Sequence, residues 1–130
     1  RTPIAYGLGW PERLQTPVAP LDLVATARLD FEAPDEDRFP CLRLARESVA
    51  RGGTAMAVCN AANEMAVAAF LANRIRFTEI PRVIERTLET VTAVEPETLA
   101  VVEAADAESR GVAAQMIAAA TGRKIGVSSA

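Results

Sequence analysis

Histidine is absent from the 130-residue sequence. It is the commonest general acid–base group at neutral pH and the commonest metal ligand, and no Ser-His-Asp or Cys-His nucleophile can be assembled without it. A P-loop, a Gly-rich dinucleotide-binding turn and a Cys-x-x-Cys pair are missing as well. We therefore assign no catalytic, cofactor-binding or metal-binding residue within this chain.

A strong charge imbalance and a long apolar run are also missing. The net charge is −3, with both signs mixed and no basic stripe, which argues against nucleic-acid binding. No apolar run approaches the roughly 18 residues that a membrane span needs. Residues 1–10 have no Met and no signal-peptide pattern, so we interpret the chain as an internal piece of a longer polypeptide.

Cysteine is scarce. The only two, Cys41 and Cys59, each lie in an apolar helical pattern, and nothing in the sequence indicates that they pair. We expect buried, reduced thiols and a cytoplasmic location.

Proline is unevenly distributed, since six of the eight prolines lie within residues 1–40. This spacing excludes a long helix and favours extended segments and turns. Residues 27–31 alternate between apolar or small and polar side chains, which predicts one short strand. An isolated strand is not stable, so this one must pair with another chain or with a missing part of its own.

From Pro40 onward the pattern is helical, and the scarcity of aromatic residues beside abundant alanine favours tightly packed helices. The predicted fold is therefore mostly α. An extended Pro-rich arm with one short strand, residues 1–39, precedes a small bundle of about four helices, residues 40–130.

The helices of this bundle begin and end at recognisable residues. Pro40 suits the first position of a helix that ends at Gly52-Gly53. Thr54 is a natural N-cap for a helix over 54–74, which is apolar on almost every side, as expected of a helix surrounded by partners. Thr78 caps the next helix, and Asp106 caps a last one that ends at 122–124, after a short helix over 96–105. The predicted apolar stripes are Leu42, Ala45 and Val49 in the first helix and Ile80, Val83, Ile84, Leu88 and Val91 in the third.

The polar residues of the 54–74 helix are Asn60, Asn63 and Glu64, which share one face. On so apolar a helix they are expected to be at least partly buried and to need hydrogen-bond partners. A structural role, tying the bundle together or bonding a neighbouring loop or the arm, is favoured over contact with a ligand.

Two further candidates have weaker support. The acidic turn Glu32, Asp35, Glu36 and Asp37 lacks the spaced oxygen ligands and the Gly of a Ca²⁺ loop, so a solvated turn is favoured over a metal site. Arg1 and Thr2 form a candidate anion site, because an Arg beside an extended strand end can bind phosphate or carboxylate.

Several blocks of the sequence together resemble one enzyme family. They are RTPIAY at 1–6, Trp10-Pro11, LDFEAPDEDRFPCLRLA at 29–45, NAANE at 60–64, AVAAFL at 66–71 and IRFTEI at 75–80. In order and spacing they resemble the C-terminal third of 1-deoxy-D-xylulose 5-phosphate reductoisomerase.

The resemblance implies an enzyme that converts 1-deoxy-D-xylulose 5-phosphate into 2-C-methyl-D-erythritol 4-phosphate in non-mevalonate isoprenoid biosynthesis. It implies NADPH and Mg²⁺ or Mn²⁺ as cofactors, a homodimer, and NADPH-binding and catalytic domains upstream in the same polypeptide. It also implies that residues 1–39 are the end of the catalytic domain and the connecting arm. The family's catalytic and metal-binding motifs are not in these 130 residues, so no site residue is carried over.

We therefore expect a structural segment of a bacterial cytoplasmic enzyme that is inactive alone. An alternative is a stand-alone helical protein-interaction module that docks through its polar residues. A third reading makes Asn60, Asn63 and Glu64 a catalytic cluster.

Overall fold

The computed structural model describes residues 2–126 and is mostly α, as predicted. It divides into two compact units, Arg1–Ala33 and Pro34–Ala130. Among the described residues, no helix is both long enough and apolar enough to cross a membrane. The two units are described separately below.

The first unit contains two short helices, α1 (Thr2–Gly9) and α2 (Leu23–Thr26). Asp22 caps α2, because one of its carboxylate oxygens accepts hydrogen bonds from the backbone N–H groups of Val24 and Ala25, both at 2.9 Å. The extended conformation predicted for the first residues is wrong, since Pro3 lies in the first turn of α1, where its missing N–H costs no hydrogen bond.

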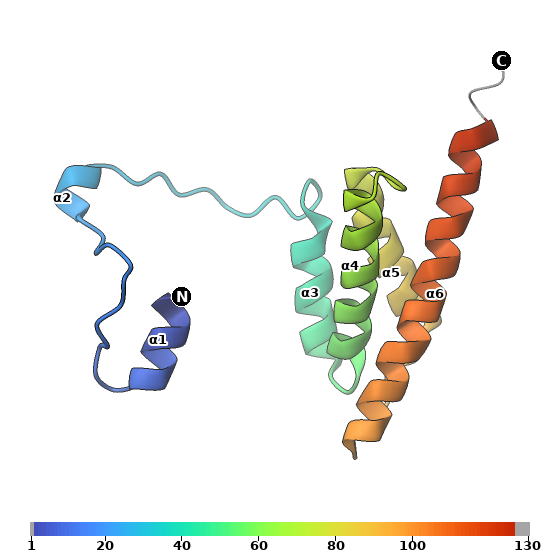
Figure 1. The fold of residues 1–130 in the computed structure, drawn as a ribbon, viewed down its shortest axis with the longest axis horizontal. Coiled ribbons are helices and arrows are strands. Elements are labelled where there is room, and N and C mark those ends of the chain that lie inside the picture. The colour runs from blue at the N-terminus through green and yellow to red at the C-terminus, as the bar shows by residue number, and fades with distance from the viewer. Residues whose placement is uncertain (1, 127–130) are drawn as a thin grey trace. The chain divides into compact units, whose positions relative to one another are not determined.

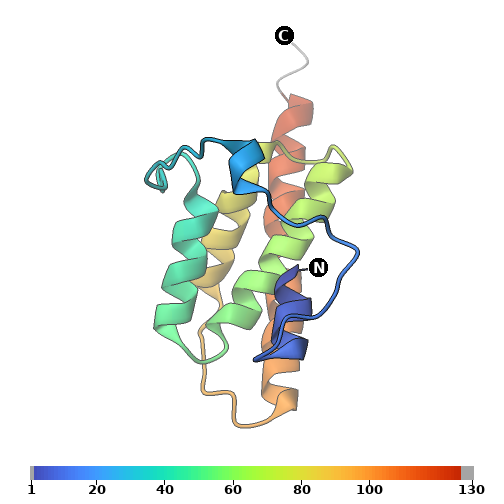
Figure 2. The ribbon, with the colours of Figure 1, turned by 90° about the vertical axis from the view of Figure 1, so that its left-hand side faces the viewer.

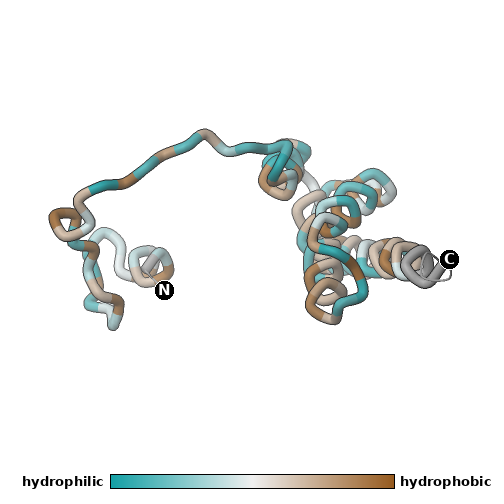
Figure 3. Tube along the Cα trace, turned by 90° about the horizontal axis from the view of Figure 1, so that it is seen from above, coloured by the Kyte–Doolittle hydropathy of each residue, from teal (hydrophilic) through white to brown (hydrophobic). Residues whose placement is uncertain are grey.

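None of the described residues of the first unit is buried. Its apolar side chains are exposed, including Ile4, Leu8, Trp10 and Phe31. Residues 27–34 have no regular secondary structure, so the strand predicted over 27–31 is not formed in this chain. Hydrophobic and hydrophilic residues alternate along this segment (Figure 3). A strand that forms only against a partner stays a prediction.

The second unit is a bundle of four long helices. These are α3 (Pro40–Arg51), α4 (Ala55–Leu71), α5 (Ile80–Thr90) and α6 (Leu99–Gly126), with a 3₁₀ turn η1 (Phe77–Glu79) before α5. The two central helices, α4 and α5, contact each other and both of the outer helices, α3 and α6. Helices α3 and α6 flank α4 on opposite sides (Figure 1), and Figure 2 shows the four helices from a second direction.

Several helix boundaries follow the local signals in the sequence. Pro40 begins α3, and Gly52 and Gly53 follow its end with φ angles of 74° and 56°, values that favour glycine. Asn73 has a φ of 58° just after α4, and asparagine tolerates this region better than most residues.

One predicted cap is right in position only, and two are wrong. Thr54 is the N-cap residue of α4, but its hydroxyl accepts a hydrogen bond from the Val94 N–H at 3.1 Å instead of capping the helix. Thr78 lies inside η1, and α5 begins at Ile80. Asp106 lies inside α6, which is one continuous helix and runs past the stop predicted at 122–124.

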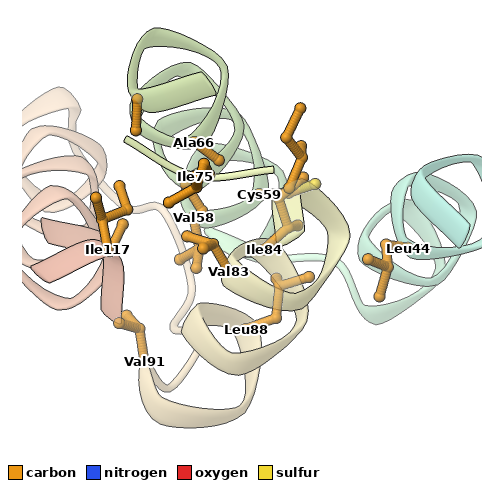
Figure 4. Close-up of a cluster of buried hydrophobic side chains, with 14 of the residues drawn as sticks. Leu44, Val58, Cys59, Ala66, Ile75, Val83, Ile84, Leu88, Val91 and Ile117 are labelled. Atoms are coloured by element: carbon orange, nitrogen blue, oxygen red, sulfur yellow. The ribbon is translucent and has the colours of Figure 1, made fainter. Parts of the chain in front are cut away.

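The core of the bundle is formed by all four helices, together with Ile75 in the loop after α4 and Val91 just after α5 (Figure 4). The apolar stripe predicted for α5 is confirmed, since all five of its residues are buried. The stripe predicted for α3 is wrong. Leu42 and Val49 are 39% and 65% exposed, whereas Leu44 and Ser48 face the core at 3% and 1%.

Three buried hydroxyls form hydrogen bonds within their own helices. Ser48, Thr87 and Ser109 each donate to the carbonyl oxygen four residues earlier, at 2.8, 2.8 and 2.6 Å. This local bond removes the cost of burying an unpaired hydroxyl. Small polar residues therefore occupy helix–helix contacts without a partner on the facing helix.

Candidate functional site

Two of the three polar residues predicted on α4, Asn60 and Glu64, form part of a network between α4 and α6. Asn60 donates a hydrogen bond to Glu64 at 3.1 Å, one turn along α4. Arg110 of α6 donates to the other oxygen of Glu64 at 2.6 Å. It also donates through Nε and Nη2 to the two oxygens of Asp106, at 2.6 and 3.2 Å. The network therefore joins residues 46 positions apart in the sequence.

The charges of this network stabilise one another. Hydrogen bonds to Asp106 and then to Glu64 raise the pKa of the Arg110 guanidinium. Hydrogen bonds from Arg110 and then from Asn60 lower the pKa of the Glu64 carboxyl. Glu64 is therefore held as a carboxylate, which suits an ion pair and does not suit a proton donor near neutral pH.

The burial predicted for the three polar residues of α4 is wrong, because all of them are exposed. The side chain of Glu64 remains 53% exposed inside its ion pair, and Asn63 lies on the outer face of the helix. The apolar composition of α4 suggested burial on every side, but the bundle covers only one side. The structural role is supported for Asn60 and Glu64, which hold α4 to α6.

The acidic turn stabilises the start of the bundle. A carboxylate oxygen of Asp35 accepts a hydrogen bond from the Arg38 N–H at 2.8 Å, and Glu36 forms an ion pair with Arg46 of α3. Within residues 2–126, no group of three or more His, Cys, Asp or Glu side chains is arranged to hold a metal ion. The other candidate site lies outside this description, because Arg1 and the side chain of Thr2 are not among the described groups.

The two cysteines are free, but only one is buried. Cys59 lies in the core, as predicted, whereas Cys41 in the first turn of α3 is exposed, so its predicted burial is wrong. Desolvation, and secondarily the presence of Cys59, raise the pKa of the Cys41 thiol. A raised pKa lowers the fraction of the reactive thiolate at neutral pH.

The sequence did not indicate a cavity of about 450 Å³ between the start of α3 and the start of α5. Its apolar side chains include Phe39, Leu42, Phe77 and Ile80, and charged residues such as Arg82 border it. No local sequence signal predicts it, because its two walls are about forty positions apart.

The described residues define the class of this chain. It is an α-helical bundle domain that follows an N-terminal unit in which none of the described residues is buried.

The family model for the DXP reductoisomerase C-terminal domain matches residues 1–112. The chain therefore belongs to the DXP reductoisomerase C-terminal domain family. This confirms the resemblance found in the sequence.

Curated relatives include the 1-deoxy-D-xylulose 5-phosphate reductoisomerase of Cellvibrio japonicus, which is 59% identical over 118 residues. That alignment covers 91% of this chain and 30% of the relative. The enzyme of Pseudomonas aeruginosa is 56% identical over 119 residues, which is 90% of this chain and 30% of the relative. The chain thus spans about a third of the length of the relatives it matches.

The chain is also similar to part of solved reductoisomerase structures. The reductoisomerase of Zymomonas mobilis, in complex with NADPH, superimposes with a TM-score of 0.78 at 48% identity, over 89% of this chain and 31% of that one. A DOX-P reductoisomerase in complex with NADPH, fosmidomycin and magnesium gives a TM-score of 0.76 at 37% identity, over the same shares of the two chains.

Proposed function

We propose that this chain is the C-terminal structural segment of an NADPH-dependent reductoisomerase. The full-length enzyme would convert 1-deoxy-D-xylulose 5-phosphate into 2-C-methyl-D-erythritol 4-phosphate in non-mevalonate isoprenoid biosynthesis. The observation that carries the proposal is the family match over residues 1–112, together with relatives of the same name at 55% identity or more.

Within this proposal, residues 1–39 are the end of the catalytic domain and the connecting arm, and residues 40–130 are the C-terminal bundle. The exposed apolar side chains of the first unit support this division. Ile4, Leu8 and Trp10 are 69%, 80% and 68% exposed, and exposed apolar side chains that form a patch mark contact sites for other protein. The missing cover would be the catalytic domain.

NADPH and Mg²⁺ or Mn²⁺ would be held by the upstream domains. The described residues of this chain do not fit either group, since they offer neither a set of metal ligands nor a Gly-rich turn for a dinucleotide. We therefore derive no catalytic step through residues of this chain. The full-length enzyme would be a cytoplasmic bacterial homodimer.

An assay of the full-length protein tests the proposal. We expect the full-length protein to consume NADPH when 1-deoxy-D-xylulose 5-phosphate and Mn²⁺ are supplied, with 2-C-methyl-D-erythritol 4-phosphate identified by mass spectrometry. The 130-residue chain under the same conditions should show no turnover. Turnover by the isolated chain, or none by the full-length protein, would contradict the proposal.

The alternative of a stand-alone interaction module is not favoured. In the relatives, the matching segment is about a third of a longer polypeptide.

The catalytic reading of Asn60, Asn63 and Glu64 is tested by Glu64→Gln in the full-length protein. A structural ion pair predicts retained turnover with a lower Tm, whereas a catalytic cluster predicts lost turnover at an unchanged Tm.

A further inference from the structure

The outer face of α4 has an unusual composition for a surface exposed to water. The five residues Met56, Asn60, Asn63, Val67 and Leu71 recur at intervals of four, three, four and four, which places them on one side of the helix. All five are exposed, and the apolar ones, Met56, Val67 and Leu71, are 45%, 36% and 72% exposed. We call these five residues the α4 outer face.

Charge is almost absent from this helix. Glu64 is the only charged residue among the 17 residues of α4, and it is already paired with Arg110. The outer side of α5, by contrast, carries Arg82, Arg86 and Glu89. A solvent-facing helix normally has a polar, charged face, and a helix that is apolar all round is normally buried on all sides.

The bundle covers only the other side of α4. Ala61, Ala62 and Ala66 are fully buried, and the neighbours of the helix are α3, α5 and α6. Helices within the bundle therefore account for the alanine-rich side, and they leave the α4 outer face without a partner among the helices of the bundle.

We propose that the α4 outer face is the surface on which the upstream part of the same polypeptide docks. This proposal rests on the proposed function, which makes the chain one segment of a longer enzyme. The amount of polypeptide outside the structure supports this occupant, because the relatives are about three times longer than the segment they share with this chain. Exposed Asn60 and Asn63 amides among the apolar residues would supply hydrogen bonds at such an interface, which is how polar groups are arranged in many protein–protein contacts.

Thiol labelling compares the exposure of this face in two contexts. In a Cys41→Ser background, Val67→Cys places a thiol on the α4 outer face, and the control Thr90→Cys places one on the exposed side of α5. Each variant is labelled with a maleimide in the 130-residue chain and in the full-length protein. We expect Val67→Cys to react at least about tenfold more slowly in the full-length protein, while Thr90→Cys reacts at the same rate in both.

A charge placed on the same face gives a second measurement. Val67→Arg should leave the Tm of the 130-residue chain unchanged, which shows that the variant folds, and should lower the Tm of the full-length protein. The matched control Thr90→Arg should leave both unchanged.

Equal labelling of Val67→Cys in the two contexts would overturn the proposal. Protection that is already present in the isolated chain and rises with its concentration would mean that a second copy covers the face, and this would also overturn it. The turnover assay is read separately. An active full-length enzyme with an unprotected Val67→Cys refutes only the docking surface, whereas a protected Val67→Cys in a protein without reductoisomerase activity refutes the proposed activity.

Discussion

The central helices α4 and α5 contact the same two neighbours, α3 and α6, yet they bury opposite kinds of side chain. Helix α5 contributes large aliphatic residues to the core, including Ile84 and Leu88. Helix α4 contributes mainly alanines, with Ala61, Ala62 and Ala66 at 0% exposure. Small residues on one helix let the larger side chains of the other pack closely against its backbone.

The solvent-facing sides of these two helices also differ, in their charge. That of α5 is charged, with Arg86 and Glu89 paired at 3.2 Å, whereas that of α4 is apolar and amide-bearing. The charged outer side of α5 suits contact with water, whereas the outer side of α4 lacks the charges that a solvent-facing helix normally carries. The predictions below test this difference, beginning with the largest expected effect.

The largest effect should come from truncating α5 in the core. Ile84 is 2% exposed and lies in the centre of the buried cluster (Figure 4). Ile84→Ala removes buried carbon atoms and leaves a cavity, so we expect a loss of about 2–5 kcal/mol in the free energy of unfolding, measured by urea denaturation. The same truncation at the exposed Val67 of α4 should change the stability of the isolated chain far less. A loss of similar size at both positions would contradict the comparison.

Enlarging the alanine side of α4 should have the next largest effect. Ala66 has no exposed surface, so Ala66→Leu forces extra carbon atoms into a packed core, and we expect a loss of about 1–3 kcal/mol. The control is Ala68→Leu, two positions away on an exposed part of the same helix. Urea denaturation of both variants measures the difference. If Ala66→Leu is as stable as the control, α4 does not pack closely against its neighbours.

The contrast between α4 and α5 also explains which parts of the fold were predictable. The stripe of α5 was predicted completely, because a single burial direction leaves a clear period in the sequence. No such period exists in α4, so its exposed side was mistaken for a buried one. In α3, the apolar Leu42 and Val49 misled the prediction, because Ser48 can be buried by bonding its own helix.

Contacts between distant residues were the least predictable. The Glu64–Arg110 pair joins two helices, and no local pattern indicates that these positions meet. Asp106 was predicted to cap a helix, but it lies inside α6 and forms an ion pair with Arg110 one turn later. The family resemblance was predictable because several separate blocks of the sequence agreed.

The start of α4 is held against the loop that follows α5. The Thr54 N–H donates to the Val94 carbonyl at 2.9 Å, and a Cβ atom on Gly53 would lie 2.6 Å from the same oxygen. Gly53 also has a φ of 56°. We therefore expect Gly53→Ala to lower the free energy of unfolding by about 1–2 kcal/mol.

Gly111 provides the control for this substitution. It lies inside α6 with open space at its Cβ position, so Gly111→Ala should stabilise the protein by about 0.5–1 kcal/mol. Changes of opposite sign in urea denaturation are expected for the two variants. Stabilisation by Gly53→Ala would mean that the junction tolerates a side chain and does not hold α4 against the loop.

The smallest effect is expected at the only charged residue of α4. The pKa of Glu64 lies below its ordinary value of 4.5, chiefly because of Arg110 and then Asn60. A lowered pKa in the folded state means that the carboxylate stabilises the fold at pH values above 4.5 and that this stabilisation is lost as the pH falls through the lowered pKa. The Tm of the native chain should therefore be slightly higher than that of Glu64→Gln at neutral pH, and the two should converge in acid. Because the pair is exposed to solvent, added salt should also reduce the difference.

The matched control is Glu89→Gln, which removes an ion pair confined to α5. It should change the Tm less, since this ion pair does not join two helices. An equal effect of the two substitutions would show that the link between α4 and α6 adds nothing beyond a local surface pair.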